Sequence, residues 1–159
     1  MLRRLTLLSP LLLLAVPAAA KDLRGRFGAG FNNQFGHVSA LSARYAFPTS
    51  SPVVNVQVEG NFGLATSPLE DGKVFSGGRL LYGTIAEDNL NLFIAGGAGA
   101  LMEGGVGTVR LQPAMGVDFF LYGLENLGMT LEWGLNLDLA EGASVSTTAA
   151  VAAGAHYWF

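Results

Sequence analysis

The ionisable side chains of this sequence recur at alternate positions within otherwise apolar segments. In MTLEWGLNLDL, residues 129–139, every odd residue is apolar and every even residue is polar or glycine. A β-strand with this pattern has one apolar face and one polar face. We predict that the charged residues on such polar faces form one network inside a closed sheet: Arg26, Arg44, Glu59, Arg79, Arg110, Asp118, Glu132 and Asp138.

Antiparallel pairing would bring several of these charges together. A turn near residue 69 places Glu59 opposite Arg79, and a turn near residue 124 places Arg110 opposite Asp138. Opposite charges at facing positions stabilise a sheet, and an unmatched charge in an enclosed interior is costly. We therefore predict two ion pairs, one near mid-height and one near a rim.

The first two segments are harder to pair. The same folding places Arg26 opposite Arg44, which is unfavourable for two like charges. We expect Asp118 or Glu132 to reach across and offset this repulsion.

Other chemistry has few residues to support it. The chain has no cysteine and only two histidines, His37 and His156, which makes a protein metal site improbable. The glycine runs FGAGF and AGGAGA lie inside alternating segments and do not open a helix after a strand, so they do not predict a nucleotide loop. No cofactor is expected.

The beginning of the chain predicts export. MLRRLTLLSPLLLLAVPAAA has a basic start, a short apolar run and an Ala-rich end, which is typical of a cleavable signal peptide over residues 1–20. After it, twelve acidic residues face seven basic ones, a net charge near −5. Without a basic patch, nucleic acid is not an expected partner.

Residues 21–159 should form one domain. They contain eight alternating segments, at 23–32, 37–47, 53–62, 73–84, 90–102, 108–119, 129–139 and 144–159. Each has about the length that a tilted strand needs to cross a bilayer, and short turn-rich links favour antiparallel neighbours. Half of the residues are hydrophobic and 13% are charged, yet no long apolar run follows the leader. We predict an all-β fold, an eight-stranded antiparallel up-and-down transmembrane β-barrel. We also expect local bulges at Gly77–Gly78 and at Pro113.

Aromatic residues mark the end of the barrel that holds both chain termini. With one register, six of them fall at the same ends of their strands: Tyr45, Phe47, Tyr82, Phe119, Tyr157 and Phe159. Such a belt is typical of a membrane–water interface, here the periplasmic one, and Phe31 and Phe62 fall at the opposite end.

The chain resembles a known class in these features. The ending AHYWF is similar to the C-terminal signal that the bacterial outer-membrane assembly machinery recognises, and residues 21–159 resemble small eight-stranded barrels of the OmpX and OmpA-transmembrane type. The resemblance implies a Gram-negative outer membrane, contact with lipid and lipopolysaccharide, and a structural or envelope-interaction role, with an unidentified envelope protein as a possible partner. The predicted outer loops are shorter than is usual in that family, and no periplasmic domain follows.

Two other functions stay open. HVS, with His37 and Ser39, has the H-x-S spacing of PagL-type lipid A deacylases, in which a serine is activated by a histidine and an acid. That family carries the motif late in the chain, and the next acid here, Glu59, is predicted to face inward. A small pore is the other alternative, although eight strands enclose a space that side chains fill. We expect no catalysis.

Overall fold

The computed structural model of the whole chain describes residues 21–33, 39–66, 72–87, 89–140 and 144–159. The predicted leader lies outside the described residues, and none of the described segments is a helix able to span a membrane. Eight strands form a closed barrel in sequence order, with β8 paired to β1. They are β1 (Phe27–Asn32), β2 (Ala40–Ala46), β3 (Asn55–Ala65), β4 (Lys73–Glu87), β5 (Leu90–Glu103), β6 (Val106–Leu121), β7 (Leu124–Ala140) and β8 (Ser144–Trp158).

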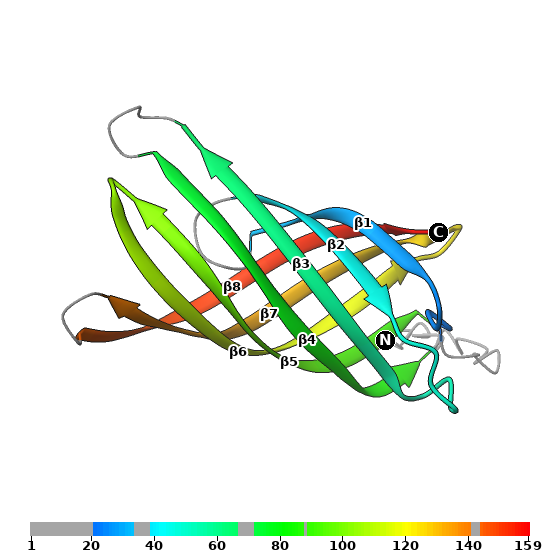
Figure 1. Cartoon of the computed structure of the whole chain (residues 1–159). Coiled ribbons are helices and arrows are strands. Elements are labelled where there is room, and N and C mark those ends of the chain that lie inside the picture. The colour runs from blue at the N-terminus through cyan, green and yellow to red at the C-terminus, as the bar shows by residue number, and fades with distance from the viewer. Residues whose placement is uncertain (1–20, 34–38, 67–71, 88, 141–143) are drawn as a thin grey trace, which may run out of the picture.

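All neighbouring strands are antiparallel, which confirms the predicted up-and-down order. Both ends of the described chain lie at one end of the barrel, here called the terminal end, at the right of Figure 1. The last residues of β3, β5 and β7 lie at the opposite end, here called the loop end.

The strands are less equal in length than the sequence pattern predicted. β1 and β2 have only 6 and 7 residues, whereas β4 to β8 have 14 to 17. Two connections are tight turns in which glycines adopt positive φ, Gly104 and Gly105 between β5 and β6 and Gly123 between β6 and β7. Only glycine adopts this conformation without strain, so the turns stay short and the strands extend into regions predicted to be loops.

The predicted bulges were wrong in position. Pairing of β4 runs unbroken through Gly77 and Gly78, and its register shift falls between Gly83 and Ile85. A second shift follows Phe120, next to the β6–β7 turn. Pro113 causes no shift: the β6–β7 pairing stops after Leu111 and resumes at Ala114 in the same register. Proline lacks an N–H, so it removes ladder bonds without adding a residue.

The two faces of the barrel wall differ sharply in chemistry. The opening segment behaves as predicted, because Leu131, Trp133 and Leu135 are exposed on the outside while Glu132 is 2% exposed. The interior also holds apolar groups that interrupted the sequence pattern, including Phe93 on β5 and the contacting pair Phe75 and Leu101. Polar and apolar side chains are therefore both buried inside the barrel.

The residues that precede β1 pack against the terminal end of the barrel. Leu23 is 1% exposed and packs with Ala46, Phe120 and Trp158 across the mouth. The Gly25 N–H donates to the Ala46 carbonyl at 2.8 Å, which fixes this segment against β2. These contacts form an apolar plug, defined here as Leu23, Ala46, Phe120 and Trp158.

Two charged residues flank Leu23 at the surface. The Arg24 side chain donates to both carboxylate oxygens of Asp22, at 2.8 and 2.7 Å. This bond, with a further one from the Arg24 backbone N–H, lowers the pKa of Asp22 to about 2. Asp22 therefore keeps its charge, and its bond to Arg24, at any pH well above that value.

Adjacent glycines on β5 provide a test of the two faces. A Cβ on Gly97 would lie 2.2 Å from the Arg79 Cβ inside the wall, whereas a Cβ on Gly96 would meet nothing within 4 Å. We expect Gly97→Ala to lower the free energy of unfolding by about 1–3 kcal/mol through overpacking. Gly96→Ala should be neutral or slightly stabilising. Urea unfolding in lipid vesicles measures both, and equal effects would contradict the assignment of the two faces.

Candidate functional site: the buried charge cluster

Strand register brings three of the predicted charges together. Arg44 on β2 faces Glu59 on β3, and Glu59 faces Arg79 on β4. The Glu59 carboxylate lies 3.1 Å from the Arg44 Nε and accepts from the Arg79 Nε at 2.7 Å. The predicted Glu59–Arg79 pair is confirmed, and both side chains have 0% exposure.

Two acidic residues reach the arginines from the other side of the barrel. Arg79 donates to both oxygens of Glu132 on β7, at 2.5 and 2.7 Å. Arg44 donates from Nη1 to Asp118 on β6 at 3.0 Å, and its Nη2 lies 3.6 Å from Glu132. The expectation that Asp118 or Glu132 reaches Arg44 is thus confirmed for both. The charge cluster, defined as Arg44, Glu59, Arg79, Asp118 and Glu132, joins five strands.

Neutral side chains complete the charge cluster, and sequence reasoning did not single them out. The Ser42 hydroxyl donates to Glu59 at 2.5 Å, Asn32 also donates to Glu59, and Thr130 donates to Asp118 at 2.6 Å. Each shares the inward phase of its charged neighbours, which is the signal that could have found it. Together they satisfy oxygens that the arginines leave, as a buried carboxylate requires.

Ser42 also lies 2.7 Å from His156 Nε2, a contact that superficially resembles a nucleophile and its base. Ser42 has one hydroxyl proton and gives it to Glu59, so His156 must direct an Nε2 proton toward Ser42. That is the wrong direction for activating the serine. Ser42 is 5% and His156 is 1% exposed, so neither presents an atom to a substrate.

The charge balance of the cluster determines which residue matters most. Three carboxylates face two guanidinium groups, and every side chain is at most 3% exposed. Loss of one arginine would leave three acids around the other, whereas loss of one acid would leave equal numbers of opposite charges.

Among the described residues no group of three metal-ligating side chains has the geometry to hold a metal ion.

Arg110 and Asp138 form the second predicted pair, toward the loop end. They face each other on β6 and β7, with two parallel bonds of 2.6 and 2.7 Å. The predicted register is confirmed, and the turn lies close to the predicted residue 124, at Tyr122–Gly123. The register shift next to that turn restores the pairing expected from the sequence.

Arg26 is the exception among the predicted network residues. Arg44 faces Gly28 and not Arg26, because β1 pairs two residues further along than expected. The Arg26 guanidinium donates to the Trp158 carbonyl at 2.9 Å, to the Phe159 carbonyl at 3.2 Å and to Asn126 at 2.8 Å. It therefore lies at the terminal end and holds β8 in place, so the expected repulsion between arginines does not arise.

The predicted aromatic residues lie on the outside in the terminal half of the barrel. Tyr45 and Phe47 pack edge to face at 5.3 Å, and Tyr157 and Phe159 do so at 5.1 Å. Phe27, which the sequence argument left out of this group, stacks on Phe159 at 6.5 Å. Tyr82 is 48% exposed and Phe119 is half-buried. Their role as an interfacial belt and assembly signal stays a prediction.

The possible catalytic pair of the sequence argument is only partly described. Ser39 is exposed at the start of the β2 region, and His37 lies outside the described residues. Glu59, the acid considered for that pair, is buried in the charge cluster. The enzyme alternative therefore gains no observation in its favour.

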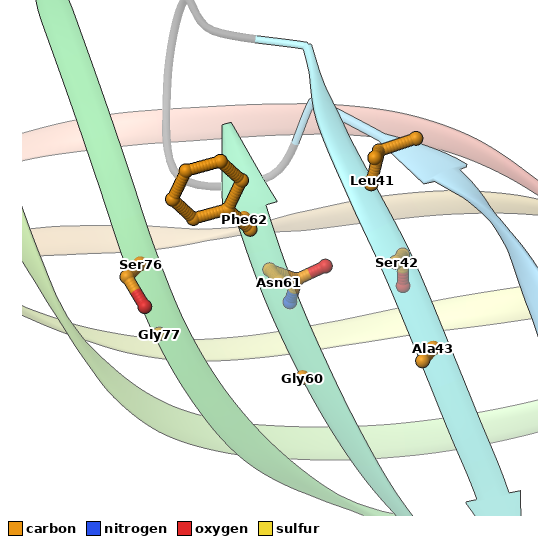
Figure 2. Close-up of a pocket in the computed structure, with 8 residues that line it drawn as sticks. All are labelled: Leu41, Ser42, Ala43, Gly60, Asn61, Phe62, Ser76 and Gly77. Atoms are coloured by element: carbon orange, nitrogen blue, oxygen red, sulfur yellow. The ribbon is translucent and has the colours of Figure 1, made fainter. Parts of the chain in front are cut away.

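The outer wall carries two larger grooves. The β2–β4 groove has a volume of about 450 Å³ and is seen in Figure 2, where Leu41 and Phe62 lie on adjacent strands above Ala43 and Gly60. The β5–β8 groove has a volume of about 580 Å³. The first borders Ser42, Asn61 and Ser76, whereas the second is lined entirely by apolar residues and glycine.

Comparison with protein-family models, with curated proteins and with solved structures finds no match to this chain. The fold therefore has to be described from its own geometry. The chain is a closed eight-stranded antiparallel β-barrel with an apolar outer surface and a buried charge cluster.

Proposed function

We propose that this protein is an integral β-barrel of a bacterial outer membrane, similar to the OmpX and OmpA-transmembrane class. The supporting observation is the distribution of polar and apolar side chains, which is the reverse of that in a water-soluble protein. Away from the strand ends, the charged and amide groups of the strands are buried or half-buried inside, while leucine, phenylalanine and valine side chains are exposed around the wall. A water-soluble protein rarely exposes so much contiguous apolar surface, whereas lipid requires it.

The interior supports a structural role over a conducting one. The charge cluster spans the middle of the barrel, and the apolar plug covers the terminal end. Two successive obstructions oppose the passage of water and ions. We propose that the lumen is closed and that the barrel acts through its outer surface and loops, by binding lipid, lipopolysaccharide or an envelope protein.

The proposal also gives the chain ends a role. The strand β8 ends at Tyr157 and Trp158, Phe159 follows it, and Tyr157 and Phe159 are exposed on the outside. This alternation is what the outer-membrane assembly machinery would read before β8 pairs with β1. The leader over residues 1–20 would direct export, and its removal would leave Lys21 as the first residue.

One experiment tests location and fold together. The outer-membrane fraction is run on a gel with and without heating, and the folded barrel should migrate faster than its heated form. Recovery only in the soluble fraction would contradict the proposal. Planar-bilayer conductance and the mass of lipid A then test the two alternatives. A closed, non-catalytic barrel should give no steady current and leave the lipid unchanged.

A further inference from the structure

The β5–β8 groove combines an apolar surface with a defect in the wall. It is lined by residues of four strands, among them Ile94, Pro113, Met115, Trp133, Ala149 and Val151. Trp133 and Met115 face each other on β7 and β6, are 54% and 55% exposed, and form one raised edge of the groove. Pro113 and Ala149 are shorter and lie two residues nearer the loop end, which leaves a depression beside that edge.

The floor of this groove has an incomplete hydrogen-bond ladder. Pairing between β6 and β7 is interrupted where Pro113 would face Leu135. Pro113 cannot donate, so the Leu135 carbonyl lacks the partner that any other residue would supply. On the inner side, Gln112 donates to Asn136 at 3.0 Å and bridges the two strands there. The outer side of the gap is covered only if something occupies the groove.

We propose that the β5–β8 groove holds one lipid acyl chain in a fixed position. This inference rests on the proposed membrane location, and it makes one lipid a bound ligand rather than solvent. The lining offers no charged side chain, so it suits a hydrocarbon and not a headgroup. A chain lying over Pro113 would keep water from the weakened ladder and would fill space that the wall leaves open.

A protein occupant fits the groove less well. Ten residues line it, whereas a stable protein–protein interface uses about 20–30 residues a side. The β2–β4 groove is also a weaker candidate for an acyl chain, because it is smaller and borders polar residues. The β5–β8 groove is thus the better match in both size and chemistry.

The two tryptophans provide the reporter. Trp133 forms one side of the groove, while Trp158 is 1% exposed inside the apolar plug. In a Trp158→Phe background, Trp133 fluorescence is quenched by any brominated acyl chain that touches it. The probe is a long-chain brominated phosphatidylcholine, titrated into vesicles of short-chain phosphatidylcholine that hold the full barrel.

A chain bound in the groove should be detected as preferential contact of Trp133 with the long-chain lipid over the short-chain lipid. A longer chain buries more methylene groups in an apolar groove, so long-chain brominated lipid should reach half-maximal quenching at a mole fraction roughly threefold lower than random mixing gives. Ala149→Ile fills the groove and should abolish this preference. Ala98→Ile adds the same bulk to an exposed position of β5 that does not line the groove, and it should leave the preference intact.

The possible results distinguish failure of the acyl-chain site from failure of the proposed membrane location. Quenching that follows the mole fraction in all three proteins would overturn the acyl-chain site while leaving membrane insertion supported. No quenching of Trp133 by any brominated lipid would contradict the membrane location itself. If Ala149→Ile does not give the heat-modifiable form, Val151→Ala shortens the edge that Val151 shares with Trp133 instead. It should reduce the preference, and an unchanged preference would overturn the proposal.

Discussion

Replacing Arg79 by methionine is expected to lower the free energy of unfolding by about 3–5 kcal/mol, the usual consequence of breaking a buried ion pair by removing one partner. Arg79 bonds to both Glu59 and Glu132, and its side chain has 0% exposure. Its loss leaves three carboxylates around Arg44. Glu59→Gln should cost less, because two acids and two arginines then remain.

The measurement is urea unfolding in lipid vesicles, with a double-mutant cycle on Arg79 and Glu132. Their bidentate contact across the barrel predicts strong non-additivity. The exposed pair Lys73–Glu103 is the control, and its removal should change stability by at most about 1 kcal/mol. Additive effects at Arg79 and Glu132 would show that the two side chains do not meet.

Replacing Leu80 by arginine should destabilise the protein in a bilayer by about 2–4 kcal/mol, the cost of a lipid-facing arginine near the membrane midplane. Leu80 lies midway along β4 and is 61% exposed. In a water-soluble protein an exposed leucine tolerates this change with an effect within about 0.5 kcal/mol. The large expected effect therefore depends on lipid.

Tyr122 provides the matched control. It is fully exposed in the β6–β7 turn, beyond the strands, and Tyr122→Arg should have little effect on unfolding in the same vesicles. Equal, small effects of Leu80→Arg and Tyr122→Arg would contradict the membrane proposal. A depth-dependent difference would support it.

The architecture of this barrel could be predicted from the sequence because alternation is a local property. Glu132 and Leu131 need opposite environments, and only an extended strand separates adjacent residues in this way. The pairs Glu59–Arg79 and Arg110–Asp138 were also predictable, because two strands joined by a short link can pair in few registers that bring opposite charges together.

Strand ends and the first hairpin could not be predicted in the same way. Arg26 shares the inward phase of Arg44, and alternation alone does not distinguish registers that differ by two residues. In the observed register Phe27 faces Tyr45, and Arg26 donates to the carbonyls of Trp158 and Phe159. Only closure of the barrel brings these carbonyls to Arg26. Contacts across the barrel, such as Arg79 with Glu132, likewise depend on closure rather than on local sequence.

Because β8 pairs with β1, the order of the strands along the chain could be changed without changing which strands pair. Arg26 holds the carbonyls of Trp158 and Phe159, and the Lys21 N–H donates to the Glu87 carbonyl at the end of β4, so both described ends lie at the terminal end of the barrel. A linker that crosses this end could therefore join residue 159 to residue 21, and the chain could be reopened at Gly104–Gly105. Such a circular permutant would keep every strand pair and turn the β8–β1 joint into an ordinary hairpin. Its insertion into the membrane would then test whether the proposed assembly signal in β8 must stand at the end of the chain.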